Sequence, residues 1–122
     1  MGYYTKYSIE FYNKDGYIKD LDFLDKIAEA LESEVDYSFT INKFKVSSTE
    51  KITWYSWENH VVKISCDNPN ILIVVKGEGE SSGDVWQAEF LNGEKVSHWV
   101  VKVCYPAPSL HKLFSNWKVT NE

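Results

Sequence analysis

The sequence predicts one α+β domain, in which two amphipathic helices pack on one face of a sheet with antiparallel strands. Three observations carry this prediction. Residues 70–105 contain three extended runs, and Asn92-Gly93 between the last two tolerates the positive φ angles of a type I′ hairpin. Residues 3–12 alternate as a strand with one buried face. Two stretches, starting near Leu21 and Trp57, repeat apolar side chains at helical spacing.

The first half of the chain predicts a strand, a helix and two further strands. The strand over 3–12 ends at the turn of residues 13–16, and Asp20 or Asp22 can cap the helix that follows. The apolar stripe of this helix consists of Leu21, Leu24, Ile27, Ala28 and Leu31. Residues 35–46 alternate as a strand, and a second strand reaches residues 52–54. The break between these strands falls either at Asn42-Lys43 or at residues 47–50, and both positions stay open.

The second half predicts a helix and a three-stranded meander. Ser56 can cap the helix, which stops near Cys66 because Asp67-Asn68-Pro69 ends helices. Residues 71–75 are apolar on both faces, as in a central strand. The next run, 85–91, places Trp86, Ala88 and Phe90 on one face and Gln87 and Glu89 on the other. The last run, 96–105, returns antiparallel and stops before the prolines of the tail 106–122, which forms a short helix at 109–117 or wraps back over the sheet.

This order of elements predicts a ferredoxin-like βαββαβ sandwich extended by a C-terminal antiparallel hairpin. Right-handed crossovers around the two helices place both on one face of the sheet. The term describes topology only, because the chain has no ligand set for an iron–sulfur cluster. At 122 residues the chain is long enough to bury one ordinary core.

Composition narrows the class of partner. The net charge is −5 and all 13 basic residues are lysines, so direct recognition of nucleic acid is disfavoured. No apolar run reaches the length of a membrane span and the first residues lack the apolar core of a signal peptide, so we expect a cytoplasmic protein without membrane contact. Cys66 and Cys104 have no metal-ligand spacing and are expected to be free, mostly buried thiols.

Residues 54–95 resemble the Api92/YubB-like group of small phage- and plasmid-borne proteins with a ferredoxin-like domain. The features that carry the resemblance are Trp54, Tyr55, Pro69, Gly77-Glu78-Gly79-Glu80, Gly83-Asp84, Trp86 and Asn92-Gly93-Glu94-Lys95. The inserted Glu94 departs from the NGK form of that hairpin. The resemblance implies the fold and an origin in a mobile element, and it brings no catalytic residues.

The predicted first helix has a strongly acidic outer face. Between Asp20 and Asp36 seven carboxylates stand against Lys26 alone. One interpretation is a solvated face that aids solubility, and the other is a surface that docks on a basic partner. The candidate partner-binding residues on this face are Asp22, Asp25, Glu29 and Glu32.

Aromatic residues form a second candidate set. The chain has 19 of them, more than a core of this size can hold, so some rings should be half exposed, as at binding surfaces. Tyr4 and Tyr12 lie in the polar phase of the first strand, and Trp54 and Tyr55 lie at a chain reversal. We include these four as partner-binding candidates, although Trp54 and Trp99 can equally belong to the core.

Metal and catalytic signals are weak. Glu78, Glu80 and Asp84 stand among glycines and could offer oxygen ligands to Mg²⁺ or Ca²⁺, but their spacing is not that of an EF-hand and a strand-end bulge explains the glycines. His60, His98 and His111 are scattered, and none forms a nucleophile–base pattern with a cysteine. We therefore predict no catalytic residues, no enzyme activity and no cofactor.

These observations favour a non-catalytic binding protein of phage or mobile-element origin. It would inhibit a host protein, for instance a CRISPR-type defence nuclease, in the host cytoplasm. Carboxylates of the first helix would oppose the basic side chains that normally hold nucleic-acid phosphates, and aromatic rings would form the centre of the contact. Two alternatives are a small-ligand or nucleotide sponge in which Trp and Tyr stack a base, and a homodimeric structural protein.

Overall fold

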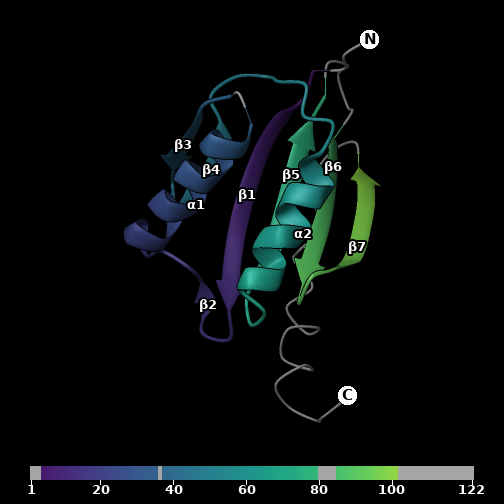
Figure 1. The fold of residues 1–122 in the computed structure, drawn as a ribbon. Coiled ribbons are helices and arrows are strands. Elements are labelled where there is room, and N and C mark those ends of the chain that lie inside the picture. Colours follow the sequence, from purple (N-terminus) through teal and green to yellow (C-terminus); the bar gives the residue numbers. More distant parts are fainter. Residues whose placement is uncertain (1–3, 36, 80–84, 102–122) are drawn as a thin grey trace.

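A computed structural model describes residues 4–35, 37–79 and 85–101, which form an open sheet of seven strands and two helices (Figure 1). The strands are β1 (Lys6–Asn13), β2 (Gly16–Tyr17), β3 (Phe39–Asn42), β4 (Lys45–Ser48), β5 (Leu72–Glu78), β6 (Val85–Leu91) and β7 (Glu94–Val101). The helices are α1 (Leu21–Glu34) and α2 (Trp57–Asp67). The predicted α+β class is confirmed for this part of the chain.

The sheet has the order β3-β4-β1-β5-β6-β7, and the short β2 pairs with β1. Every pairing is antiparallel. Both helices lie over the same face of the sheet, α1 over β3 and β4 and α2 over β5 and β6, and β1 runs between them (Figure 1). This sheet differs from a four-stranded ferredoxin-like sheet in having β2 on β1 and the pair β6–β7 beyond β5.

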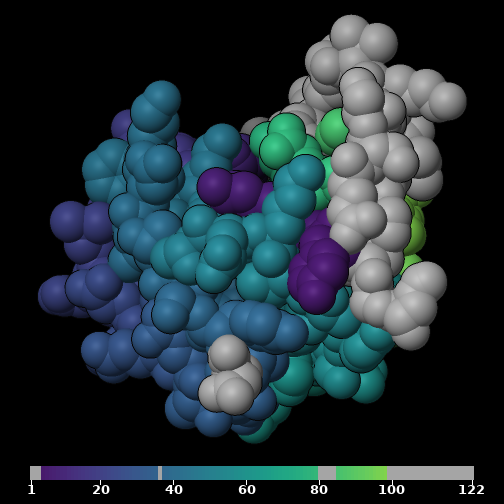
Figure 2. Space-filling view, turned by 90° about the horizontal axis from the view of Figure 1, so that it is seen from above, coloured from purple at the N-terminus to yellow at the C-terminus, as the bar shows by residue number. Residues whose placement is uncertain are grey.

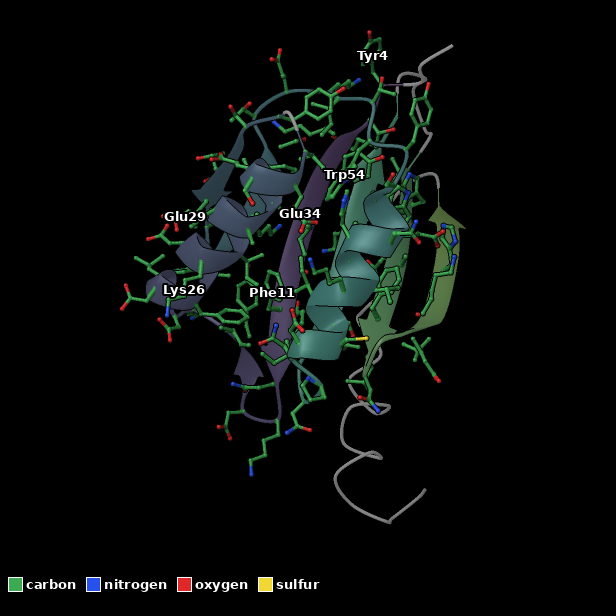
Figure 3. The ribbon with its side chains drawn as sticks, in the orientation of Figure 1. Tyr4, Phe11, Lys26, Glu29, Glu34 and Trp54 are labelled. Carbon is green, nitrogen blue, oxygen red and sulfur yellow. The ribbon has the colours of Figure 1, made fainter. Side chains whose placement is uncertain are left out.

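Strand β1 shows why the sheet has two unlike faces. Its alternation buries Tyr7, Ile9 and Phe11 beneath the helices, where Phe11 is 0% exposed (Figure 3). Glu10 and Tyr12 fall on the opposite face, because neighbouring side chains of a strand point to opposite sides. That face holds a smaller apolar cluster of Leu72, Val74 and Leu91, with Tyr12 and Val96 against it. The expectation that residues 71–75 are apolar on both faces is met by β5, which serves both clusters.

Helix α1 begins as its sequence predicts. The carboxylate of Asp20 accepts hydrogen bonds from the backbone N–H groups of Asp22 and Phe23, which satisfies two of the unpaired donors of the first turn. Its buried residues are Leu24, Ile27, Ala28 and Leu31. The prediction that Leu21 belongs to this stripe is wrong, since Leu21 in the first turn is 53% exposed. The apolar contact of α1 with the sheet therefore starts one turn later.

The β3–β4 hairpin occupies the earlier of the two positions left open by the sequence. Asn42 pairs with Lys45, so Lys43 and Phe44 form a two-residue loop with φ angles of 55° and 63°. The predicted extension of the second strand to residues 52–54 is wrong, because β4 ends at Ser48. Ile52 keeps only an isolated bridge, exchanging two backbone hydrogen bonds of 2.9 Å with Thr5. In the view from this end of the molecule, the start of the described chain lies against the segment between β4 and α2 (Figure 2).

Helix α2 and the β6–β7 hairpin meet at their ends. Ser56 occupies the predicted N-cap position without a side-chain capping hydrogen bond. At the other end, the Ser65 hydroxyl accepts a 2.8 Å hydrogen bond from the backbone N–H of Gly93. Asn92 and Gly93 have φ angles of 54° and 80°, so the predicted type I′ geometry is confirmed. Cys66 is exposed, which corrects the prediction of a mostly buried thiol: it lies in the last turn of α2 beside this hairpin.

Strand β7 begins at Glu94, two residues before the predicted run, and the β6–β7 register shifts between Glu89 and Phe90. The predicted tail 106–122, with its helix at 109–117, lies outside the described residues, and so do Cys104 and His111. Neither α1 nor α2, the helices of the described ranges, is long and apolar enough to cross a membrane.

Candidate functional site

The acidic face of α1, formed by Asp22, Asp25, Glu29 and Glu32, is exposed along its whole length. Positions 22, 25, 29 and 32 follow one another at intervals of three or four residues, so they form one stripe on the outer side of the helix. Figure 3 shows Glu29 and Lys26 pointing away from the sheet. Within the described ranges, Asp22, Asp25 and Glu29 take part in no ion pair. The stripe therefore carries uncompensated negative charge.

Glu32 differs from the other three because it also has a structural contact. Its Oε2 accepts a 2.8 Å hydrogen bond from the backbone N–H of Phe39, which links α1 to the start of the edge strand β3. No local pattern predicts this bond, because its two partners lie seven residues apart on different elements. Glu32 thus belongs to the acidic face and also fixes α1 on the sheet.

Trp54 belongs to the core and not to the surface. It is 4% exposed and packs edge-to-face on Tyr7 and Phe39, with ring centroids 5.1 Å and 5.4 Å away. Its Nε1–H donates a 2.9 Å hydrogen bond to Nδ1 of His60, which satisfies the buried indole N–H. Of the two interpretations that the sequence left open for Trp54, the core position is the one observed.

His60 connects this core contact to the groove between the helices. Its Nε2 lies 3.4 Å from Oε1 of Glu34, and Oε2 of Glu34 accepts a 2.9 Å hydrogen bond from Lys63. The Lys63 ammonium group lowers the pKa of the Glu34 carboxyl group, and Glu34 in turn raises the pKa of Lys63. Glu34 lies between α1 and α2 (Figure 3), so its charge serves helix–helix contact and does not add to the acidic face.

The tyrosine candidates are spread over the molecule. Tyr4 and Tyr55 are 50% and 76% exposed, and Figure 3 places Tyr4 at the end of the sheet, apart from Glu29. Tyr12 lies on the sheet face opposite to α1 and α2, which carries no helix among the described residues and which we call the helix-free face, and it donates a 3.1 Å hydrogen bond to Oε1 of Glu10. The described residues therefore do not gather the predicted aromatic rings around the acidic face.

The helix-free face holds a polar network that the sequence did not reveal. Glu10 is 5% exposed, and its two carboxylate oxygens lie 3.3 Å from Nζ of Lys45 and 3.3 Å from Nζ of Lys76. On β6, the buried Glu89 accepts hydrogen bonds from Gln87 at 3.3 Å and from Ser97 at 3.0 Å. These residues occupy the polar phase of their strands, which predicts their face but not their burial.

Three tyrosines carry raised pKa values: Tyr12 and Tyr17 lie beside this network, and Tyr7 lies on the opposite face of the sheet beneath the helices. Burial raises the pKa of Tyr17 to about 12, helped by the negative charge of Glu10. Burial also raises the pKa of Tyr12, again with Glu10 as the next cause, and burial raises the pKa of Tyr7 to about 12. Each hydroxyl is therefore held in its neutral form by the folded chain.

We expect the folded chain to lose stability between pH 10 and pH 12. An unfolded tyrosine releases its proton near pH 10, whereas these three keep theirs in the folded chain, so the free energy of unfolding falls as pH rises through this window and is unaffected below it. Urea denaturation at a series of pH values checks this, and Tyr12→Phe should make the fall less steep. An absorbance titration in which every tyrosinate of the folded chain forms near pH 10 would contradict it.

A groove of about 430 Å³ opens on the helix-free face across β3, β4, β1 and β5. We call it the lysine groove, after the four lysines among its lining residues. The described residues that line it are Lys6, Ser8, Thr40, Asn42, Lys43, Lys45, Ser47, Ser48, Thr49, Lys76 and Glu78. Glu78 is the one acidic side chain in that lining. Sequence reasoning missed this groove, because it depends on the register of four strands.

No group of three or more His, Cys, Asp or Glu side chains that could hold a metal ion occurs among residues 4–35, 37–79 and 85–101. Of the weak metal candidates, Glu78 lines the lysine groove, while Glu80 and Asp84 lie outside the described residues. Nδ1 of His98 lies 3.4 Å from Nζ of Lys95, and partial burial of the imidazole, followed by the Lys95 charge, lowers the pKa of His98.

Comparison of the chain with family models, with curated proteins and with solved structures gave no match. The resemblance of residues 54–95 to the Api92/YubB-like group therefore stays a prediction.

Proposed function

We propose that this protein is a non-catalytic binding protein that inhibits a host protein by occupying a basic surface with the acidic face of α1. The single observation that carries the proposal is the exposed stripe of Asp22, Asp25 and Glu29, which has no ion pair within the described part of the chain. Such a stripe complements lysine and arginine side chains, and it speeds association by electrostatic steering.

The cost of this charge pattern to the helix supports a role beyond solubility. Asp25 and Glu29 are four residues apart, and Glu29 and Glu32 are three apart, so like charges face each other along α1. Asp22 suits the positive N-terminus of the helix, but the later carboxylates do not. Glu32 is compensated by its hydrogen bond from the backbone N–H of Phe39, whereas Asp25 and Glu29 have no ion pair within the described residues. Such a local conflict without a compensating contact is expected at functional sites.

The class of target follows from the same chemistry. Proteins that hold nucleic-acid phosphates present clustered lysines and arginines, so a host defence nuclease of the CRISPR type is the kind of target that we propose. Together with the resemblance of residues 54–95, this leads us to propose a phage or mobile-element protein that acts in the host cytoplasm. The exposed Tyr4 and Tyr55 would contribute to contacts at the end of the sheet.

We also infer that β1, α1, β3, β4, α2 and β5 form a ferredoxin-like unit. The local order β3-β4-β1-β5 with antiparallel neighbours supports this inference, and so does the position of both helices over one face (Figure 1). Strands β6 and β7 would then be the predicted hairpin extension.

Charge reversal on α1 tests the proposed function. We expect Asp25→Lys/Glu29→Lys to weaken binding to a basic target at least about ten-fold, because attraction is replaced by repulsion. The same variant should be no less stable than the wild-type chain, because the new lysines at positions 25 and 29 lie three residues from Asp22 and Glu32, and this attraction offsets the repulsion among the lysines. Target proteins are captured from host lysate on the immobilised chain, identified by mass spectrometry, and titrated in purified form against both chains.

The matched control is Glu50→Lys/Glu94→Lys, which makes the same change of charge at exposed positions outside α1. This control should bind the purified target within about two-fold of the wild-type chain at moderate salt. Equal affinities for all three chains, or a target that loses binding equally with both double variants, would refute a specific role of the acidic face.

A further inference from the structure

The lysine groove has the composition of a site for an anion. Its lining includes Lys6, Lys43, Lys45 and Lys76, together with hydroxyl groups and one side-chain amide. The lining contains four ammonium groups and the carboxylate of Glu78, and the carboxylate of Glu10 adjoins it, so the groove has an excess of positive charge. The whole chain, in contrast, has a net charge of −5. Ammonium and hydroxyl donors are the groups that bind phosphate oxygens in proteins.

Two of these lysines are held in place before any ligand arrives. The buried carboxylate of Glu10 contacts Nζ of Lys45 with one oxygen and Nζ of Lys76 with the other, each at 3.3 Å. Tyr12 donates a further hydrogen bond to the same carboxylate. Glu10 is 5% exposed, and the side chains of Lys45 and Lys76 are 36% and 16% exposed, so the contact is partly shielded from solvent and restricts both lysine side chains.

A third lysine is placed by an unusual turn. Lys43 and Phe44 both have positive φ angles, a conformation that glycine adopts readily and lysine and phenylalanine rarely adopt. The Tyr17 hydroxyl lies 2.9 Å from the carbonyl oxygen of Lys43 and 3.1 Å from that of Phe44, which holds the turn closed. This turn places Lys43 among the residues that line the groove.

The lining also limits what kind of phosphate compound fits. None of the described lining residues is aromatic or aliphatic, so the groove offers no surface on which a base or an acyl chain could pack. Its volume of about 430 Å³ lies in the range of small-molecule sites. Lysine binds phosphate as a point charge, without the bidentate geometry of arginine. A groove lined by lysines therefore suits a small anion.

We propose that the lysine groove binds a small, multiply phosphorylated molecule through its phosphate groups. This site is on the face of the sheet opposite to α1, and it is independent of the function proposed for the acidic face. It differs from the sponge considered from the sequence, in which aromatic rings stack a base.

The experiment titrates inorganic pyrophosphate and tripolyphosphate into the full chain by calorimetry at low salt. The variant is Lys6→Gln/Lys43→Gln, which removes two exposed groove lysines without touching the Glu10 contacts. The matched control is Lys19→Gln/Lys26→Gln, which removes the same charge from exposed positions outside the groove. Thermal melts check that each variant is folded.

We expect the wild-type chain to bind tripolyphosphate more tightly than pyrophosphate. The groove variant should raise Kd at least about ten-fold, and the control should change it less than about two-fold. Equal weakening by both double variants, or no binding to the wild-type chain at millimolar ligand, overturns the proposal. A single-stranded oligonucleotide that binds through the same lysines more tightly than tripolyphosphate also overturns it, because the occupant is then a nucleic-acid backbone.

Discussion

Replacing Gly77 by alanine is expected to lower the free energy of unfolding by about 3 kcal/mol, the upper end of the usual cost of overpacking a core. Gly77 of β5 pairs with Trp86 of β6, and the indole ring lies across the glycine backbone. A Cβ atom added at Gly77 would stand 2.2 Å from Cε2 and 2.3 Å from Cζ2 of that ring. Either the ring or the strand must therefore move.

The Trp86 ring cannot move freely, because other rings surround it. Its centroid lies 4.9 Å from that of Trp57, 5.9 Å from that of Tyr7 and 5.7 Å from that of His98. Rings at these distances are in contact, and displacing one of them disturbs the packing of α2 on the sheet. The cost of the added methyl group is thus spread over a cluster that joins β1, α2, β6 and β7.

Urea denaturation of Gly77→Ala, with and without Trp86→Leu, measures this effect. In the Trp86→Leu background the same glycine substitution should cost less than about 1 kcal/mol, because the smaller side chain leaves room for the methyl group. A Gly77→Ala chain as stable as the wild-type chain would contradict the close contact. Equal costs in both backgrounds would show that the loss comes from backbone strain and not from Trp86.

Replacing Glu10 by alanine is expected to destabilise the chain by about 3 kcal/mol, the lower end of the cost of breaking a buried ion pair. The substitution leaves Lys45 and Lys76 without their shared carboxylate and removes the acceptor of the Tyr12 hydroxyl. The cost lies at the lower end because the Lys45 side chain is 36% exposed and can reach water.

Two further variants distinguish the loss of a buried ion pair from the loss of an exposed one. Glu58→Ala removes the exposed carboxylate that pairs with Lys95, and it should cost less than about 1 kcal/mol. Glu10→Gln keeps the shape and the acceptor for Tyr12 but removes the charge, so its cost should lie between the two. Denaturation midpoints measured side by side test the order, and equal costs for Glu10→Ala and Glu58→Ala would contradict the buried network.

Local patterns in the sequence predicted much of the fold. Alternation assigned Trp86, Ala88 and Phe90 to one face of β6, as observed, and Asn92-Gly93 predicted a turn whose φ angles are both positive. These features depend on neighbouring residues only. The sequence left alternatives open where a distant partner decides. The hairpin near Asn42-Lys43 was one of two possible positions, and its carbonyl groups are held by Tyr17, 26 and 27 residues away.

The candidate sites also differ in whether a local pattern or a distant partner determines them. The acidic face of α1 follows from helical spacing, so sequence alone could propose it. The lysine groove and the Glu10 network require the register of β1 with β4 and β5, which sets Ser8 beside Ser47 and Lys76. No local pattern encodes that register. For Trp54, the sequence allowed both a surface and a core position. The hydrogen bond from its indole N–H to His60, together with its burial, decides for the core.

The placement of α1 and the lysine groove on opposite sides of one sheet gives the domain an electric moment through its thickness. A polyanion approaching in solution would be repelled from the α1 side and turned toward the groove, whereas a polycation would be turned the other way. Both orientations would arise before any contact forms and would weaken as added salt shortens the Debye length. The two faces of the sheet would thus direct polyanions and polycations to opposite sides of the domain.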